Sequence, residues 1–163
     1  MSEKIISITI DSNCINAKGN LPYMNKIESV SKKGIVKIYK TSNMDTEFFE
    51  GKGYQEGLRK SKDCQEDIGP GTWGVDRWEH FKWGSKFDHN RLENIKSILF
   101  KGRKNLSKKQ IRDCKHLQAH ITYGRDIFIT SDKHFLNNSK SIKNKLNAIV
   151  MNPEDFYKEI LNL

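Results

Sequence analysis

Residues 107–132 read SKKQIRDCKHLQAHITYGRDIFITSD, and this stretch indicates a helix, a turn and a buried strand followed by an aspartate. Ser107 and Gln110 have the spacing of a capping box, which predicts that a helix begins after Ser107. Gly124 predicts the end of that helix. Residues 126–130 are mostly apolar and predict a short buried strand, and Asp132 lies just past it.

The same alternation continues on both sides of this stretch. Further apolar, β-branched runs predict strands at 4–10, 35–41 and 146–151. Apolar spacing and capping residues predict helices at 21–31, from about 43, over 91–100 and from 152 to 161. Near-continuous apolar strands that alternate with helices predict an α/β fold. We expect a three-layer α/β/α sandwich around a mostly parallel sheet of four to five strands.

The chain has 163 residues, which predicts a single domain over 1–163. Seven of its 11 glycines and all three tryptophans lie between 51 and 84, so we expect an irregular insertion at about 51–88. Its GKGYQEG segment (51–57) does not have the spacing of a dinucleotide-binding loop. Trp73, Trp78 and Trp83 are either the core of the insertion or a platform on which bases stack.

The charge of the chain favours a polyanionic partner. There are 29 Lys and Arg against 20 Asp and Glu, a formal net charge of +9. Residues 101–112 hold six basic residues and no acidic one, and they are either a solvated helix end or a grip on a phosphate backbone. The candidate nucleic-acid-binding residues in this run are Arg103, Lys104, Lys108, Lys109 and Arg112.

Other classes of protein are not expected. No apolar run is long enough for a membrane helix, and the first residues do not read as a secretory signal. Cys14, Cys64 and Cys114 form no C-x-x-C pair, so neither a zinc ribbon nor a thioredoxin motif is expected. A reducing, cytoplasmic location is the simplest expectation.

Acidic residues recur just past the predicted strands. Asp11 follows the first strand, Asp45 and Glu47 follow the second, and Asp132 follows the third, while Asp113 lies on the helix before it. The carboxyl ends of parallel strands share one edge of a sheet, where ligands bind. Taken singly, each acid could equally belong to a turn or a helix start. Together they predict an acidic pocket that a hard divalent cation such as Mg²⁺ would stabilise, and phosphodiester chemistry at that cation.

Segment 112–136, RDCKHLQAHITYGRDIFITSDKHFL, resembles the D-x-x-H-L-x-x-A … D-x-F-x-T-x-D-x-x-F-L pattern of the PIN-domain family of metal-dependent nucleases. The ITIDSN opening (8–13) and the LNAIVMNPEDF ending (146–156) resemble the first and last strands of that family. TSNMDTE (41–47) is a weaker match to the segment that carries the second acid. The resemblance covers residues 5–50 and about 106–160, and it leaves out the Gly- and Trp-rich stretch.

The resemblance implies a metal-dependent endoribonuclease that uses Mg²⁺ or Mn²⁺ and hydrolyses RNA. It implies that the catalytic, metal-binding acids are Asp11, Glu47, Asp113 and Asp132, with Asp45 as the alternative to Glu47. Asn13 and Thr130 would orient carboxylates or water. Many members are toxins of toxin–antitoxin pairs, so an antitoxin protein and a second copy of the chain are the candidate partners.

Two alternatives stay open at this point. A non-catalytic PIN-like module that binds RNA or protein would share the fold, although the presence of all four acids argues against it. His116 and His120 could be taken for metal ligands or bases, but we expect both to be packing residues, because a Mg²⁺ site does not need histidine. A phosphoacceptor receiver domain is disfavoured, because Asp11 stands alone after the first strand.

Overall fold

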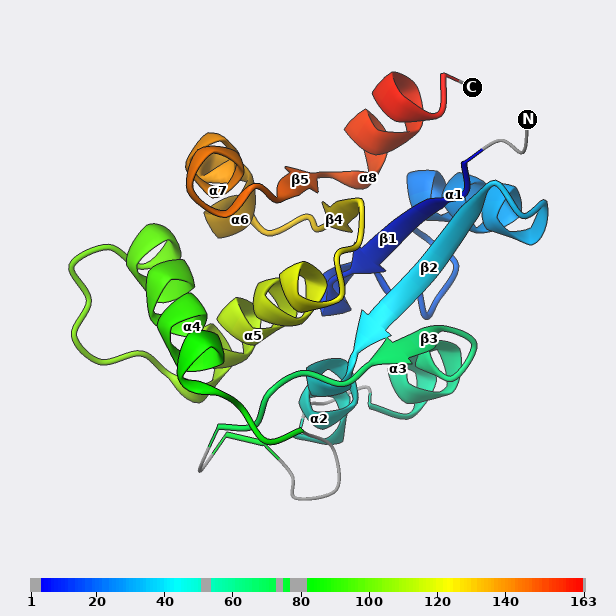
Figure 1. Ribbon diagram of the computed structural model, residues 1–163. Coiled ribbons are helices and arrows are strands. Elements are labelled where there is room, and N and C mark those ends of the chain that lie inside the picture. The colour runs from blue at the N-terminus through cyan, green and yellow to red at the C-terminus, as the bar shows by residue number, and fades with distance from the viewer. Residues whose placement is uncertain (1–3, 51–53, 73–74, 77–81, 163) are drawn as a thin grey trace.

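The computed structural model describes residues 4–50, 54–72, 75–76 and 82–162, and within them strands alternate with helices (Figure 1). The strands are β1 (Ile6–Ile10), β2 (Val36–Thr41), β3 (Gln65–Asp67), β4 (Ile127–Ile129) and β5 (Ile149–Met151). The helices and helical turns are η1 (Ser12–Cys14), α1 (Pro22–Lys32), α2 (Ser42–Glu50), α3 (Tyr54–Ser61), α4 (Lys86–Leu99), α5 (Lys108–Thr122), α6 (Lys133–Asn137), α7 (Ser139–Leu146), α8 (Pro153–Asp155) and η2 (Phe156–Ile160).

The strands form one parallel sheet in the order β3-β2-β1-β4-β5. The order places β1 in the centre, with β2 on one side and β4 on the other. Ile10 pairs with Ile129, so the residues that follow β1 and β4 emerge side by side at the carboxyl edge. The parallel sheet predicted from the sequence is therefore confirmed, and its central strands deliver their following residues to one place.

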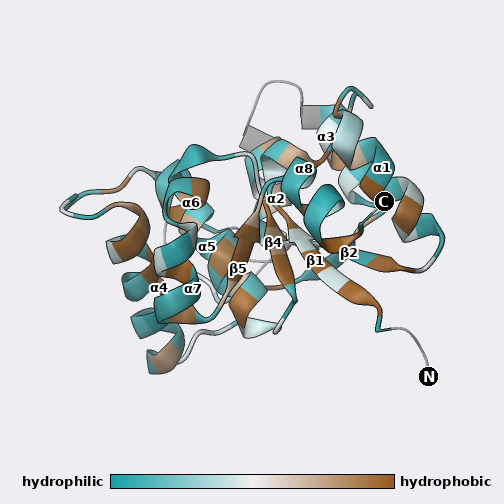
Figure 2. Cartoon of the chain, turned by 90° about the horizontal axis from the view of Figure 1, so that it is seen from above, coloured by the Kyte–Doolittle hydropathy of each residue, from teal (hydrophilic) through white to brown (hydrophobic). Residues whose placement is uncertain are grey.

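Helices cover both faces of the sheet, as expected for a three-layer sandwich. On one face, Ile8, Ile10 and Val36 pack against Met24 and Ile27 of α1, in a core that also takes in the end of the chain. A second core on the other face joins the apolar residues of α4, α5, α6 and α7 to β4 and β5. Figure 2 shows the apolar strands between these two groups of helices, whose outward surfaces are polar. The α/β class and the layered plan are confirmed.

Helix α5 is enclosed on several sides, which the sequence did not predict. Its capping box at Ser107 and Gln110 is formed as predicted, and Gly124 ends it with a positive φ of 61°. The expected apolar stripe faces α4, but every residue from 112 to 120 is buried. Residues 68–72 and 75–76, which we call the crossing segment, lie against the helix and cover the flank that would otherwise be solvated.

The stretch at 51–88 is more regular than predicted. It contains α3 and the edge strand β3, and α4 begins at Lys86, earlier than the expected start near 91. Strand β3 has no apolar pattern: Gln65 and Glu66 are exposed, and it pairs with β2 alone. The glycine at 57 lies where α2 and α3 come together, because a Cβ there would approach the Phe48 ring to 2.8 Å. The description of 1–163 as one domain remains a prediction.

The last strand is shorter than predicted, and the one described tryptophan is exposed. The strand predicted at 146–151 begins only at Ile149, because Leu146 ends α7 and Asn147 follows it in the left-handed conformation, with φ 52°. Trp73 and Trp78 lie outside the described residues. Trp83 is 81% exposed and therefore does not belong to a core.

Candidate active site

Asp11 is fixed at the carboxyl end of β1 by a set of short hydrogen bonds. It is 2% exposed, and its Oδ1 accepts from the Ser12 backbone at 2.8 Å. Its Oδ2 accepts from the Thr130 hydroxyl at 2.8 Å and from Asn13 Nδ2 at 3.0 Å. Burial raises the pKa of Asp11, and the positive charge of His116 is the largest influence in the opposite direction. Asp11 is thus a buried carboxyl with its orientation set by three neighbours.

Thr130 and Asn13 connect the ends of β1 and β4. Besides its bond to Asp11, the Thr130 oxygen accepts a hydrogen bond from the backbone of Asp132 at 3.0 Å. The Asn13 side-chain oxygen accepts from the Ser131 backbone at 3.1 Å. The two residues that the resemblance assigns to supporting roles therefore lie in contact with Asp11, and they place Asp132 close to it. Their role toward a metal stays a prediction.

The structure separates Glu47 from Asp45. Both carboxylate oxygens of Asp45 lie 3.0 Å from Lys40 Nζ, and one of them also accepts from the Ser61 hydroxyl at 2.9 Å. Glu47 extends in another direction, where its Oε1 lies 3.1 Å from Nε2 of His116. Asp45 is therefore ion-paired with Lys40 of β2 and hydrogen-bonded to α3, and Glu47 is the α2 acid that shares its surroundings with Asp11.

His116 is a charged partner of Glu47, whereas the sequence indicated only a packing residue. It is completely buried, and its Nδ1 meets the Thr41 hydroxyl while its Nε2 meets Glu47. Burial alone would lower the pKa of His116, but the charge and hydrogen bond of Glu47, together with Asp11, raise it to about 9. The pKa of Glu47 is lowered because His116 outweighs the effect of burial. At neutral pH the two therefore form a buried ion pair.

His120, one turn further along α5, is different. Its Nδ1 lies 2.9 Å from the Thr9 hydroxyl and its ring contacts Phe128 edge-on. Burial lowers the pKa of His120 to about 4, so it is neutral at physiological pH. Its surroundings are those of the packing residue that the sequence analysis expected.

Asp113, on α5, lies near Asp11 and Glu47. It is 9% exposed, and within the described parts of the chain no hydrogen bond or ion pair reaches its carboxylate. Burial raises the pKa of Asp113 to about 7, with further contributions from the negative charges of Asp11, Glu47 and Asp132. Three carboxyl groups, from the residue after β1, from α2 and from the residue before α6, therefore act on that of Asp113. We call Asp11, Glu47, Asp113 and Asp132 the acid cluster.

The acid cluster offers the oxygen ligands that a hard cation prefers, but it does not surround an ion on all sides. Within residues 4–50, 54–72, 75–76 and 82–162, no three His, Cys, Asp or Glu side chains are gathered closely enough to hold a metal ion. Mg²⁺, however, usually takes one or two protein carboxylates and keeps several waters. Asp113 is buried and has no hydrogen-bond or ion-pair partner among the described residues, so a cation would stabilise its ionised form. The residues fit an ion bound mainly through Asp11 and Asp113, with water completing its shell.

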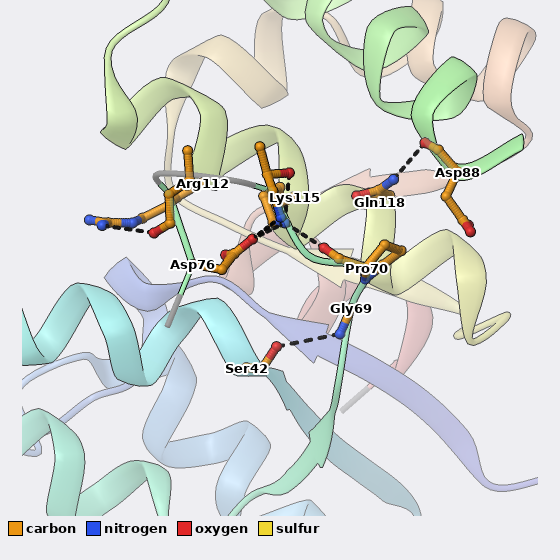
Figure 3. Close-up of polar contacts among 10 residues, drawn as sticks. Ser42, Gly69, Pro70, Asp76, Asp88, Arg112, Lys115 and Gln118 are labelled. Atoms are coloured by element: carbon orange, nitrogen blue, oxygen red, sulfur yellow. Dashed lines mark hydrogen bonds and ion pairs between the residues drawn. The ribbon is translucent and has the colours of Figure 1, made fainter. Parts of the chain in front are cut away.

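Gly69, Pro70 and Asp76 of the crossing segment lie against α5 around Lys115 (Figure 3). The Lys115 side chain is 1% exposed, and its Nζ donates to the Pro70 carbonyl, the Thr72 hydroxyl and the Asp76 carboxylate. Gly69 N also donates to the Ser42 hydroxyl at the start of α2. These contacts fasten the crossing segment to α5 and α2, the two helices that carry Asp113 and Glu47.

Arg112 is set apart from the other basic residues of the 101–112 run. It is 5% exposed, and its Nη2 donates to the Val75 carbonyl at 3.3 Å (Figure 3). It therefore stabilises the crossing segment, and we remove it from the surface expected to contact nucleic acid. Arg103, Lys104, Lys108 and Lys109 are all exposed. Lys109 lies one helical turn before Asp113 on the same side of α5, so the basic surface leads toward the acid cluster.

Comparisons with known proteins do not assign this chain to a family. No family model matches the chain, and no curated protein matches it. One similar solved structure is described as VapBC2 from Rickettsia felis bound to a DNA fragment from their promoter. The likeness has a TM-score of 0.48 and 11% sequence identity, over 90% of this chain and 98% of that one. In the described residues, none of the helices combines the length and apolar character needed to cross a membrane.

Proposed function

We propose that this protein is a metal-dependent endoribonuclease of the PIN type. The single observation that carries the proposal is the buried carboxyl group of Asp113, which has no ion-pair or hydrogen-bond partner among the described residues and lies among three other acids at the carboxyl edge of the sheet. A protein with a net charge of +9 has no general reason to concentrate negative charge there. A divalent cation would balance the charge of the acids and bind the phosphate of a polyanionic substrate.

The residues divide the work of hydrolysis. Asp11 and Asp113 would hold the cation, and Thr130 and Asn13 keep the Asp11 carboxylate in one orientation. A bound Mg²⁺ or Mn²⁺ would supply an activated water and neutralise charge on the phosphate. In the reaction, the water oxygen bonds to phosphorus, an ester P–O bond breaks, and a proton passes to the leaving oxygen.

Glu47 and the basic surface would have different roles in the reaction. The buried ion pair with His116 keeps Glu47 ionised, so that it can hold or orient water beside Asp11. Arg103, Lys104, Lys108 and Lys109 attract the RNA backbone and hold it across the start of α5. A cytoplasmic location, an antitoxin partner and a homodimer accompany this proposal as predictions. A small neighbouring gene that encodes a DNA-binding protein would support the antitoxin role.

The test is RNA cleavage by the purified protein with Mg²⁺ or Mn²⁺, on single-stranded and structured substrates. We expect chelation to stop cleavage, and Asp11→Asn, Asp113→Asn and Asp132→Asn each to abolish it. Asp126→Asn is the matched control, because Asp126 precedes the same strand β4 at its other end and bonds to Ser7 and Lys4. Undiminished cleavage in chelator, or equal effects of all four substitutions at matched folded fraction, would overturn the proposal. Binding of RNA without cleavage would favour the non-catalytic module.

A further inference from the structure

A hollow beside the acid cluster lies on the side of the sheet opposite α5. It has a volume of about 240 Å³ and opens between the start of α1 and the start of α8. Its walls are mostly apolar, with Leu21, Pro22 and Tyr23 on one side and Pro153 on the other. Helices α1 and α8 pack against each other, so both walls rest on ordered helices.

One residue of the hollow, Ser131, adjoins the acid cluster. Ser131 lines the hollow and lies between Thr130 and Asp132 in the sequence. The Ser131 backbone donates to Asn13, which in turn donates to Asp11. The Ser131 hydroxyl has one weak contact among the described residues, to the Cys14 sulfur at 3.7 Å. A group bound in the hollow would thus lie next to the cluster and meet an available hydroxyl.

The size and chemistry of the hollow suit a single nucleobase. Pockets for whole ligands have volumes of about 300–1,000 Å³, so this smaller one suits one ring system. A nucleobase has two apolar faces and a polar edge, and proteins bind unstacked bases between aromatic or apolar side chains. Pro22, Pro153 and the Tyr23 ring offer such surfaces, and the Ser131 hydroxyl can meet the polar edge.

Lys26 adds a positive charge beside the Tyr23 wall of the hollow. Lys26 is exposed, and its Nζ lies 5.1 Å from the centre of the Tyr23 ring and 5.0 Å from that of Tyr157. The acid at the rim, Glu154, is already paired with Lys158 at 2.6 Å. The rim therefore suits an anionic group such as a phosphate, and the nearness of the hollow to the acid cluster favours RNA over an acidic peptide or the apolar side chain of a partner protein.

We infer that this hollow receives one nucleobase of the RNA, next to the phosphodiester that is cleaved, and so determines the base preference at that position. The inference rests on the proposed function. The basic surface at the start of α5 and the hollow lie on opposite faces of the sheet, so the RNA would cross its carboxyl edge over the acid cluster.

The test measures the contribution of each base to binding. The non-cleaving Asp11→Asn protein is titrated with short single-stranded RNAs in which one nucleotide after another is made abasic. We expect one position to show a loss of about 5-fold or more, the equivalent of one stacked base, while the other positions change little. In the wild-type protein, a cleaved random-sequence RNA should show a base preference at that same distance from the cut.

Two substitutions assign the effect to the hollow. Leu21→Phe should fill it and Tyr23→Ala should remove one wall, and each should abolish the loss at that position and flatten the base preference. Ile35→Phe is the matched control, because it adds the same bulk at an exposed residue beyond the amino end of β2. Thermal melting shows whether each variant is folded. If one of them is not, the abasic series with the other variant tests the inference.

The outcomes separate this inference from the proposed function. A protein that cleaves RNA with metal, but loses affinity equally at every abasic position, overturns the inference alone. A position-specific loss that survives both Leu21→Phe and Tyr23→Ala also overturns it. A protein that cleaves no RNA with either metal overturns the proposed function and this inference with it.

Discussion

Replacing Asp113 by asparagine should stabilise the metal-free protein. Burial and the neighbouring acids raise the pKa of Asp113 from 3.8 to about 7, and each tenfold change in proton affinity corresponds to about 1.4 kcal/mol. At about pH 8 the folded state therefore bears up to about 4 kcal/mol for keeping this group ionised. Relaxation and water entry reduce such penalties, so we expect about 2 kcal/mol. For a chain of this size that is about 4–8 °C in Tm.

The pH dependence has a definite sign. The folded state holds a proton on Asp113 more tightly than the unfolded state, so wild-type stability falls as pH rises from about 4 to about 7. The asparagine variant lacks this fall. The two melting temperatures should therefore coincide near pH 4 and separate with rising pH, when both proteins are melted in chelator.

With Mg²⁺ added, wild type should melt at a higher temperature than Asp113→Asn. A ligand that binds only the folded state stabilises it by about 2.7 kcal/mol at a concentration 100 times its Kd. Wild type should gain such an increment, and Asp113→Asn should gain much less. Asp88→Asn is the control: hydrogen bonds from Ser85 lower the pKa of Asp88, so this change should lower stability near neutral pH. If Asp113→Asn melts several degrees below wild type in chelator, and wild type does not respond to Mg²⁺, Asp113 is a structural partner and our reasoning fails.

Other consequences of the structure can be measured separately. Glu47→Gln should reduce the kcat of RNA cleavage, whereas Asp45→Asn should lower the melting temperature and leave kcat near wild type; equal kcat values would contradict the assignment of the second acid. Mg²⁺ affinity should rise with pH through about 7, because the cation competes with the proton on Asp113, and a pH-independent calorimetric titration would contradict this. Lys115→Met should lower the free energy of unfolding by about 3–5 kcal/mol, and adding Asp76→Leu should recover part of it, as expected for a buried ion pair; a cost below about 1 kcal/mol would contradict burial of the pair. In a salt series, the log–log slope of RNA binding should flatten by about two to three units when three exposed lysines are neutralised together, and an unchanged slope would return this run to a solvated helix end. These three are Lys104, Lys108 and Lys109.

The two longest strands were predictable because each lies within a run of mostly apolar, β-branched residues. Residues 4–10 and 35–41 each lie within one residue or two of β1 and β2. The capping box at Ser107 marked the start of α5 because two side chains satisfy two backbone groups in a fixed spacing. Strand β3 was missed because its residues, Gln-Glu-Asp, carry no apolar pattern and it pairs on one side only.

The acids of the candidate site could be predicted from their places after the strands, but their partners could not. Glu47 and Asp45 are two residues apart, and only the fold shows that Lys40 takes one and His116 the other. The interval from Asp113 to His116 places both on neighbouring positions of α5, which is the signal that could have indicated a shared site. Arg112 resembled a surface charge in the sequence, because nothing there showed that Val75 of the crossing segment would lie against it.

The central claim is that a metal-activated water at the acid cluster breaks the RNA chain. The most direct measurement is cleavage by the wild-type protein with Mg²⁺ in water enriched in heavy oxygen, followed by mass spectrometry of the new ends. The account predicts one heavy oxygen in the terminal phosphate as it first forms, no cyclic phosphate, and no product in chelator or with Asp113→Asn. A cyclic phosphate without the heavy oxygen, or the same products in chelator, would contradict it.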